Sequence, residues 1–151
     1  MKMMEAMKGA KRLDICMMNL ALKELADFLM LMKRHSNTVI RIIADGGKDH
    51  KMGSKLAELM ENGIQVKIPR SKEDNSTKAI MHHKFAIVDT KAAIMGSLNW
   101  TKTGVLQNQE AVLISRNKKA ISVLAKAFGL MWGQYENASK EVFLDISLGI
   151  S

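Results

Sequence analysis

A histidine and a lysine of matching parity are the residues best suited to chemistry in this sequence. His82 and Lys84 lie two residues apart in the run MHHKFAIVD, residues 81–89. Side chains alternate between the two faces of a strand, so this pair projects to the same side. A neutral imidazole can attack phosphorus, and a lysine ammonium can hold the non-bridging oxygens of a phosphate. The pair therefore favours chemistry on a phosphodiester.

A second polar pair follows in the run GSLNWT, residues 96–101. Ser97 and Asn99 are also two apart, and a turn near Thr90 and Lys91 would bring the two strands side by side. A hydroxyl and an amide could then donate hydrogen bonds to the charge that develops on phosphorus in the transition state. Asp89 has the opposite parity to the histidine and lysine, so we expect it to support a neighbouring group rather than to contact phosphorus.

The apolar pattern changes period several times along the chain, which indicates alternating strands and helices. Strands are predicted at residues 14–20, 39–44, 64–68, 81–88, 92–97 and 110–115, and helices at residues 22–30, 54–61 and 118–135. Residues 69–78 are expected to form an exposed loop. This order predicts an α/β fold with a mixed sheet flanked by helices on both faces. One domain is expected over residues 11–136, preceded by a truncated or disordered segment at 1–10 and followed by a tail at 137–151.

Composition limits the class of protein and its partners. The 151 residues suit one domain, and the formal net charge of +8 favours anionic partners such as nucleic acid, anionic lipid or phosphate esters. A single cysteine, Cys16, excludes an intramolecular disulfide and a cysteine-based zinc site, and its apolar neighbours favour a buried structural thiol. No stretch approaches 18 uninterrupted apolar residues, so no transmembrane helix is expected.

Together these residues resemble a known signature. His82, Lys84 and Asp89, followed by Gly96-Ser97-x-Asn99, look like the H-x-K-x4-D and G-S-x-N motifs of the phospholipase D superfamily. The segments MHHKFAIVD and GSLNWT are most similar to those of the branch that includes the mitochondrial cardiolipin hydrolase, also known as the Zucchini endonuclease. Other short segments agree, so the resemblance covers roughly residues 11–135.

The resemblance implies a role for each matching position. His82 would be the nucleophile that forms a phosphohistidine, and Lys84 would bind phosphate. Asp89 matches the motif aspartate, and Glu110 matches the acidic position that orients the histidine. The implied substrate-binding residues are Lys84, Ser97 and Asn99. No metal or other cofactor is implied, and one motif per chain implies a homodimer in which the second copy completes the site.

The substrate stays open at this level. The resemblance implies a metal-independent phosphodiesterase, for which the basic charge favours an endonuclease acting on single-stranded RNA or DNA. A cardiolipin or phospholipid hydrolase is the first alternative, with an anionic phospholipid as substrate. A catalytically inactive module that binds polyanions is the second. The resemblance alone suggests an intracellular protein at the mitochondrial surface.

Overall fold

The computed structural model describes residues 1–45, 53–69 and 80–143, and within these ranges the strands form one seven-stranded sheet. The strand order is β6-β5-β4-β1-β2-β3-β7. Pairing is parallel between β1, β2 and β3 and antiparallel elsewhere. The elements are α1 (Lys2–Met7), β1 (Arg12–Met17), α2 (Lys23–Ser36), β2 (Val39–Ala44), α3 (Leu56–Glu61), β3 (Gln65–Ile68), β4 (Lys84–Val88), β5 (Ala92–Gly96), α4 (Lys102–Leu106), β6 (Val112–Ser115), α5 (Lys118–Gln134), β7 (Glu136–Asn137) and the short 3-10 helix η2 (Lys140–Val142).

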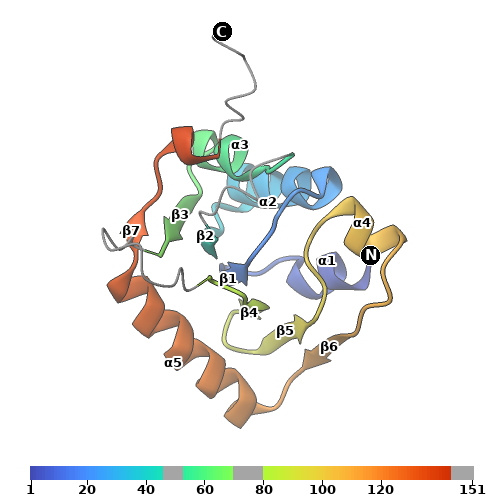
Figure 1. The fold of residues 1–151 in the computed structure, drawn as a ribbon. Helices are drawn as coiled ribbons and strands as arrows, with labels where there is room; N and C mark the ends of the chain where they lie inside the picture. The colour runs from blue at the N-terminus through green and yellow to red at the C-terminus, as the bar shows by residue number, and fades with distance from the viewer. Residues whose placement is uncertain (46–52, 70–79, 144–151) are drawn as a thin grey trace, which may run out of the picture.

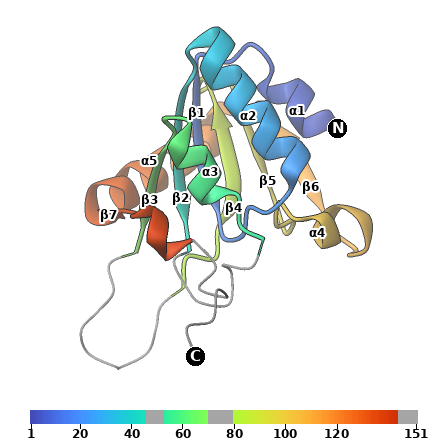
Figure 2. The same cartoon turned by 90° about the horizontal axis from the view of Figure 1, so that it is seen from above.

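Helices cover both faces of the sheet, which confirms the predicted α/β fold (Figures 1 and 2). Helices α1, α2 and α3 lie on one face and α5 lies on the other. Alternation along β1 divides the core accordingly: Leu13 and Ile15 join the cluster under the three helices, and Cys16 joins the cluster under α5. Burial raises the pKa of the Cys16 thiol, as expected of a structural cysteine rather than a nucleophile.

The start of the chain is ordered, where disorder was one of the two expectations for residues 1–10. Lys2–Met7 forms helix α1. Met3 and Met7 are four residues apart, share one face of this helix, and are buried in the first core.

Helix α4 was not predicted, because its five residues are too few to show a helical period. Within the described ranges no helix is long and apolar enough to cross a membrane. Most of the predicted loop at 69–78 and the tail residues 144–151 lie outside the described residues.

Cationic side chains fasten α5 to the sheet. Arg41 on β2 donates two hydrogen bonds to Asp14 on β1, at 2.7 and 2.9 Å. Its guanidinium also lies 4.7 Å from the ring centre of Phe128 and 4.8 Å from that of Trp132, whose rings are stacked. Lys67 on β3 donates a 2.7 Å hydrogen bond to the carbonyl of Trp132. The cation–π contacts of Arg41 and the hydrogen bond from Lys67 therefore hold α5 against the sheet, and the Arg41–Asp14 pair orients the guanidinium.

The turn between β4 and β5 is held by Asp89. Asp89 and Thr90 both have a positive φ, of 49° and 56°, which is uncommon for residues other than glycine. The Asp89 carboxylate accepts hydrogen bonds from the backbone N–H groups of Lys11 and Arg12, at 2.9 and 2.8 Å. Asp89 thus anchors the start of β1 to the end of β4.

Replacing Asp89 by alanine should lower the free energy of unfolding by about 1–3 kcal/mol, because two N–H groups lose a charged acceptor. Asp89→Asn is the matched control, since asparagine keeps one carboxamide oxygen and tolerates a positive φ. Urea denaturation followed by circular dichroism measures both. An alanine variant as stable as the asparagine variant would contradict this assignment.

Candidate active site

The candidate site lies at one end of the central strands, where β1 and β5 end and β4 and β6 begin. Because β4 runs antiparallel to β1 and β5, its first residue, Lys84, lies beside the last residues of those strands, and the first residue of β6 pairs with the end of β5. The β1–β4 pairing continues one step further, since the N–H of Met18 donates to the carbonyl of His83 at 3.1 Å. The motif residues therefore enter the sheet at this end.

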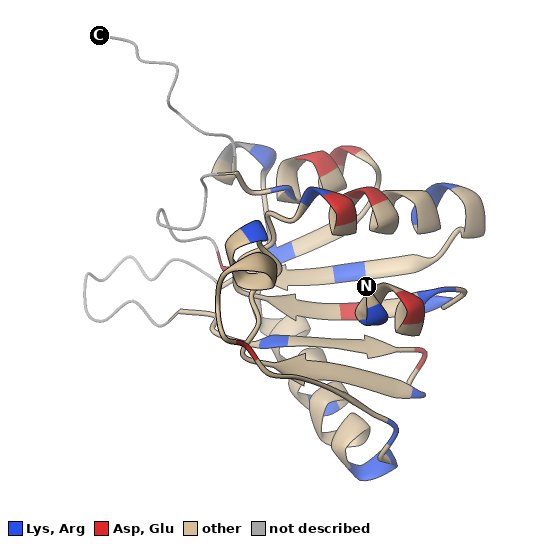
Figure 3. Cartoon of the chain, turned by 90° about the vertical axis from the view of Figure 1, so that its right-hand side faces the viewer, with Lys and Arg blue, Asp and Glu red and all other residues tan. Residues whose placement is uncertain are grey.

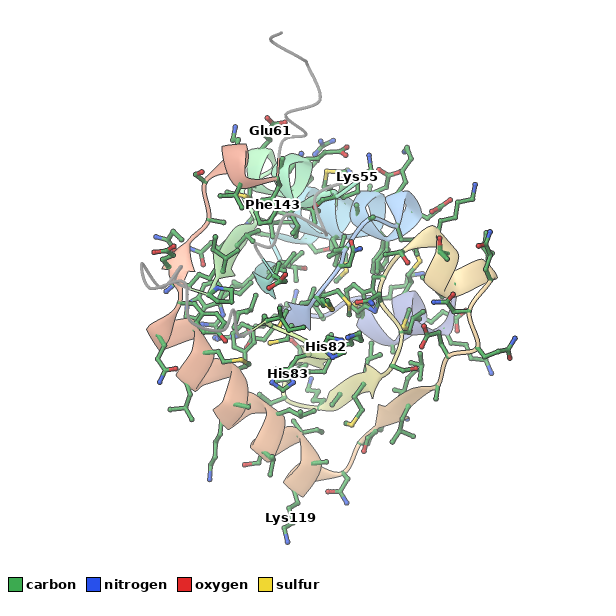
Figure 4. The ribbon with its side chains drawn as sticks, viewed as in Figure 1. Lys55, Glu61, His82, His83, Lys119 and Phe143 are labelled. Carbon is green, nitrogen blue, oxygen red and sulfur yellow. The ribbon has the colours of Figure 1, made fainter. Side chains whose placement is uncertain are left out.

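The two histidines precede β4 rather than lie within it, so the predicted strand begins three residues too early. Strand parity still separates them. The His83 ring packs edge-on against Phe85 in the second core, with 5.5 Å between ring centres. His82 instead meets Lys84, which confirms that these two side chains come together. Figure 4 shows both histidines at the start of β4.

Lys84 holds His82 by two contacts. Its Nζ lies 2.9 Å from the His82 carbonyl oxygen and 3.4 Å from Nδ1 of the ring. The same Nζ lies 3.7 Å from the sulfur of Met18. Burial lowers the pKa of Lys84, and the negative charge of Glu110 partly offsets that effect. The ammonium is thus partly desolvated, which strengthens its attraction for an anion, whereas the nearby carboxylate of Glu110 reduces that attraction.

Ser97 and Glu110 are joined by a direct hydrogen bond, in which the serine hydroxyl donates to Oε2. Asn108 donates to the other carboxylate oxygen at 3.1 Å. These two donors lower the pKa of Glu110 and keep it ionised. Gly96 makes this arrangement possible, because a Cβ there would lie 1.9 Å from the carbonyl oxygen of Ala111. Residues 96–97 can therefore lie flat against the start of β6.

The positions of Glu110 and Asp89 bear on their predicted roles. Among the described residues no hydrogen bond joins Glu110 to His82, so its orienting role stays a prediction. Asp89 lies at the opposite end of β4 from Lys84, five residues along an extended strand. The structure does not bring it beside Lys84, and its carboxylate instead holds the start of β1. This is a supporting role of the kind that strand parity predicted for Asp89.

Asn99 and a residue that was not predicted, Asn19, share an unusual property. The side-chain oxygen of each is fully buried and has no hydrogen-bond partner in the part of the chain that the structure describes. The backbone carbonyl of Asn19 accepts a 3.1 Å hydrogen bond from the N–H of Trp100. Because Asn99 directly precedes Trp100, this bond holds the backbone of Asn19 close to that of Asn99. The β1–β4 register, extended past Met18, places Asn19 opposite His82. A buried unpaired amide costs about 1–3 kcal/mol, and such groups often occur at functional sites.

Asp45 is a further residue that the sequence did not single out. It is 6% exposed at the end of β2, and its carboxylate accepts a 3.3 Å hydrogen bond from the N–H of Met81. This bond fixes the segment that leads into His82. Trp100 is 2% exposed and belongs to the first core. Within the described ranges no group of three or more His, Cys, Asp or Glu side chains could hold a metal ion.

Comparison with known proteins points to one family. Residues 3–132 match the family described as cardiolipin synthase, PLD-like domain. The chain is 32% identical over 129 residues to a mitochondrial cardiolipin hydrolase of Chlamydomonas reinhardtii, covering 85% of this chain and 54% of that protein. The human mitochondrial cardiolipin hydrolase is 31% identical over 143 residues, covering 94% and 54%. This chain therefore spans about half the length of these relatives.

Solved structures share the fold. NucT from Helicobacter pylori superposes with a TM-score of 0.80 at 18% identity, covering 91% of this chain and 89% of that one. Nuc, a phospholipase D family member from Salmonella typhimurium, superposes with a TM-score of 0.73 at 21% identity, covering 89% and 87%. At these identities the superpositions speak for the fold alone.

Replacing Asn99 by leucine should raise the free energy of unfolding by about 1 kcal/mol, because it removes a buried acceptor that has no partner. Asn117→Leu is the contrasting control: Asn117 caps α5 by accepting from the N–H of Ala120 at 3.1 Å, so its loss should destabilise by about 1 kcal/mol. Chemical denaturation of both variants measures the difference. Equal destabilisation by both substitutions would contradict an unpaired amide at Asn99.

Replacing Glu110 by glutamine should lower the pKa of Lys84 further, because the carboxylate charge now raises it. Binding of inorganic phosphate needs the protonated lysine, so its alkaline decline should move to lower pH in the variant. Phosphate affinity measured across pH tests this, with Glu136→Gln as the control for loss of a carboxylate elsewhere. An alkaline limb that stays in place would show that Glu110 does not act on Lys84.

Proposed function

This chain belongs to the phospholipase D superfamily, and from that premise we propose that it is a phosphodiesterase whose nucleophile is His82. The observation that carries the proposal is the contact between Lys84 and the His82 ring at the edge where Ser97 and Asn99 also lie. The activity is proposed rather than taken from the relatives, because the chain spans only about half of their length.

The resting contact suggests how the histidine is activated. While charged Lys84 donates toward Nδ1, a neutral ring carries its proton on Nε2. A phosphodiester offers Lys84 stronger anionic acceptors and draws it away from the ring. Nδ1 can then take the proton, and the Nε2 lone pair attacks phosphorus. The bond from phosphorus to the leaving oxygen breaks, and a phosphohistidine remains.

A second copy of the chain would complete the reaction. The departing alkoxide needs a proton, and we propose that His82 of the partner subunit gives it in a two-fold dimer. The same imidazole then removes a proton from water, the water oxygen bonds to phosphorus, and the phosphorus–nitrogen bond breaks. Because Glu110 does not reach its own His82, we propose that it orients His82 of the partner subunit. Ser97 and Asn108 hold Glu110 ionised for this role.

Single-stranded RNA or DNA is the substrate we propose. A net charge of +8 concentrates polyanions near the site, and phosphate contacts supply much of the affinity for nucleic acid. Cardiolipin or a related phospholipid is the second candidate. The relatives named mitochondrial cardiolipin hydrolase favour it, and their name also supports a mitochondrial location. A polyanion-binding module without turnover is the third.

Cleavage of a labelled single-stranded oligonucleotide in the presence of EDTA tests the proposal, beside turnover of cardiolipin vesicles under the same conditions. His82→Asn should abolish product formation by at least about a thousandfold, because the nucleophile is lost while the amide preserves size. His83→Asn is the matched control and should keep most activity, since its ring packs on Phe85.

Each outcome decides between the candidates. Oligonucleotide cleavage that survives EDTA and is lost only in His82→Asn supports the nuclease. Lipid turnover alone assigns the phospholipase. A folded dimer that turns over neither substrate would leave the binding module, and a His82→Asn variant that still cleaves would refute the nucleophile.

A further inference from the structure

The outer face of α5 combines exposed aliphatic and cationic side chains. Val123 is 60% exposed and Leu130 67% exposed, and at a helical period of 3.6 residues they share one face with Lys119 and Lys126. The opposite face is buried in the second core through Ile121 and Phe128. In Figure 4 the Lys119 side chain points away from the molecule. This outer face has no partner within the described chain.

The charge on this segment has one sign. Between residues 111 and 135 the sequence has no Asp or Glu, and its cations, all exposed, are Arg116, Lys118, Lys119 and Lys126. Figure 3 shows the contrast: α5 carries blue and no red, whereas helices on the other face of the sheet carry both colours. A positive field without compensating carboxylates attracts an extended anionic surface.

An apolar hollow adjoins the helix at its start. It is lined by Met95, Asn117, Lys119, Ala120, Val123 and Leu124. Leu113 on the edge strand β6 pairs with Met95 and is 60% exposed on the same side of the sheet. The exposed aliphatic surface thus extends from the middle of α5 to the edge of the sheet. Contiguous apolar surface with a cationic rim is typical of an interaction site.

We propose that this surface, the outer face of α5 with Leu113 and the adjoining hollow, docks on an anionic phospholipid bilayer. A helix that lies in the plane of a bilayer places aliphatic side chains at the acyl boundary and lysines among the headgroups. Along one face of α5, Lys119 and Lys126 alternate with Val123 and Leu130, and the long lysine side chains can extend to the headgroups while the aliphatic side chains meet the acyl boundary. Each component of the surface has a counterpart in the bilayer: phosphate for the cations and acyl chains for the aliphatic side chains.

Other occupants match the surface less well. A second copy docked two-fold on the same patch would set lysines against lysines, and that repulsion opposes association. Nucleic acid would satisfy the cations, but exposed Val123, Leu130 and Leu113 would gain nothing from a phosphate backbone, and the patch offers no exposed aromatic ring for base stacking. An anionic bilayer serves both kinds of side chain.

Docking does not depend on the proposed chemistry. None of the site residues His82, Lys84, Ser97 or Glu110 belongs to this surface. A His82→Asn chain should therefore bind vesicles as the parent does, so the failure of either proposal can be told from the failure of the other.

Vesicle flotation tests the proposal with the whole chain. Equimolar phosphatidylcholine and phosphatidylglycerol vesicles are compared with vesicles of phosphatidylcholine alone. Lys119→Glu with Lys126→Glu should weaken binding to the anionic vesicles by at least about tenfold. Its control, Lys8→Glu with Lys91→Glu, makes the same change in net charge at exposed positions elsewhere and should leave most binding intact.

A second pair of variants tests the aliphatic part. Val123→Ser with Leu130→Ser should also weaken binding by at least about tenfold, because the aliphatic side chains that contact the acyl boundary are lost. Leu31→Ser, at a 56% exposed position on α2, is the matched control. Thermal melting confirms that each variant is folded. Equal binding by patch and control variants, binding to neither vesicle, or a parent dimer that the patch variants dissociate would each overturn the proposal.

Discussion

The antiparallel pairing of β4 between β1 and β5 is the constraint on which the site depends. Strand direction decides which residues meet at an edge, and only this direction brings the start of β4 to the ends of β1 and β5. Had β4 run parallel to β1, Lys84 would lie at the other edge, beside Arg12. The same strand also separates Asp89 from His82, because the histidine precedes the first residue of β4 and Asp89 follows its last residue.

Part of this arrangement could be predicted from the sequence. The two-residue spacing of His82 and Lys84 was enough to predict that their side chains meet, and the order of apolar runs was enough for the fold class. Asn19 and Asp45 could not be predicted, because each owes its place to a partner far along the chain: Trp100 and Met81. Spacing within a segment predicts which face a side chain takes, whereas pairing between distant segments decides what it meets.

The short elements show the same limit. Met3 and Met7 form a buried helix face because they pack against the first core. A six-residue run of this composition does not by itself predict that contact. The bounds of the strands are likewise set by their neighbours. β4 begins at Lys84 because the regular ladder with β1 begins there, with a single further hydrogen bond from Met18 to His83, although the apolar and polar alternation in the sequence starts earlier.

The two tryptophans occupy separate parts of the molecule. Trp100 is buried beside the site, with its backbone N–H and carbonyl both bonded to the loop after β1. Trp132 lies on α5, stacked on Phe128 beneath the Arg41 guanidinium and within reach of Lys67. Indole emission depends on polarity and on nearby cations, so each ring senses different surroundings. The chain thereby carries two native optical reporters, one for the candidate site and one for α5, and removing either indole would let the other be observed alone.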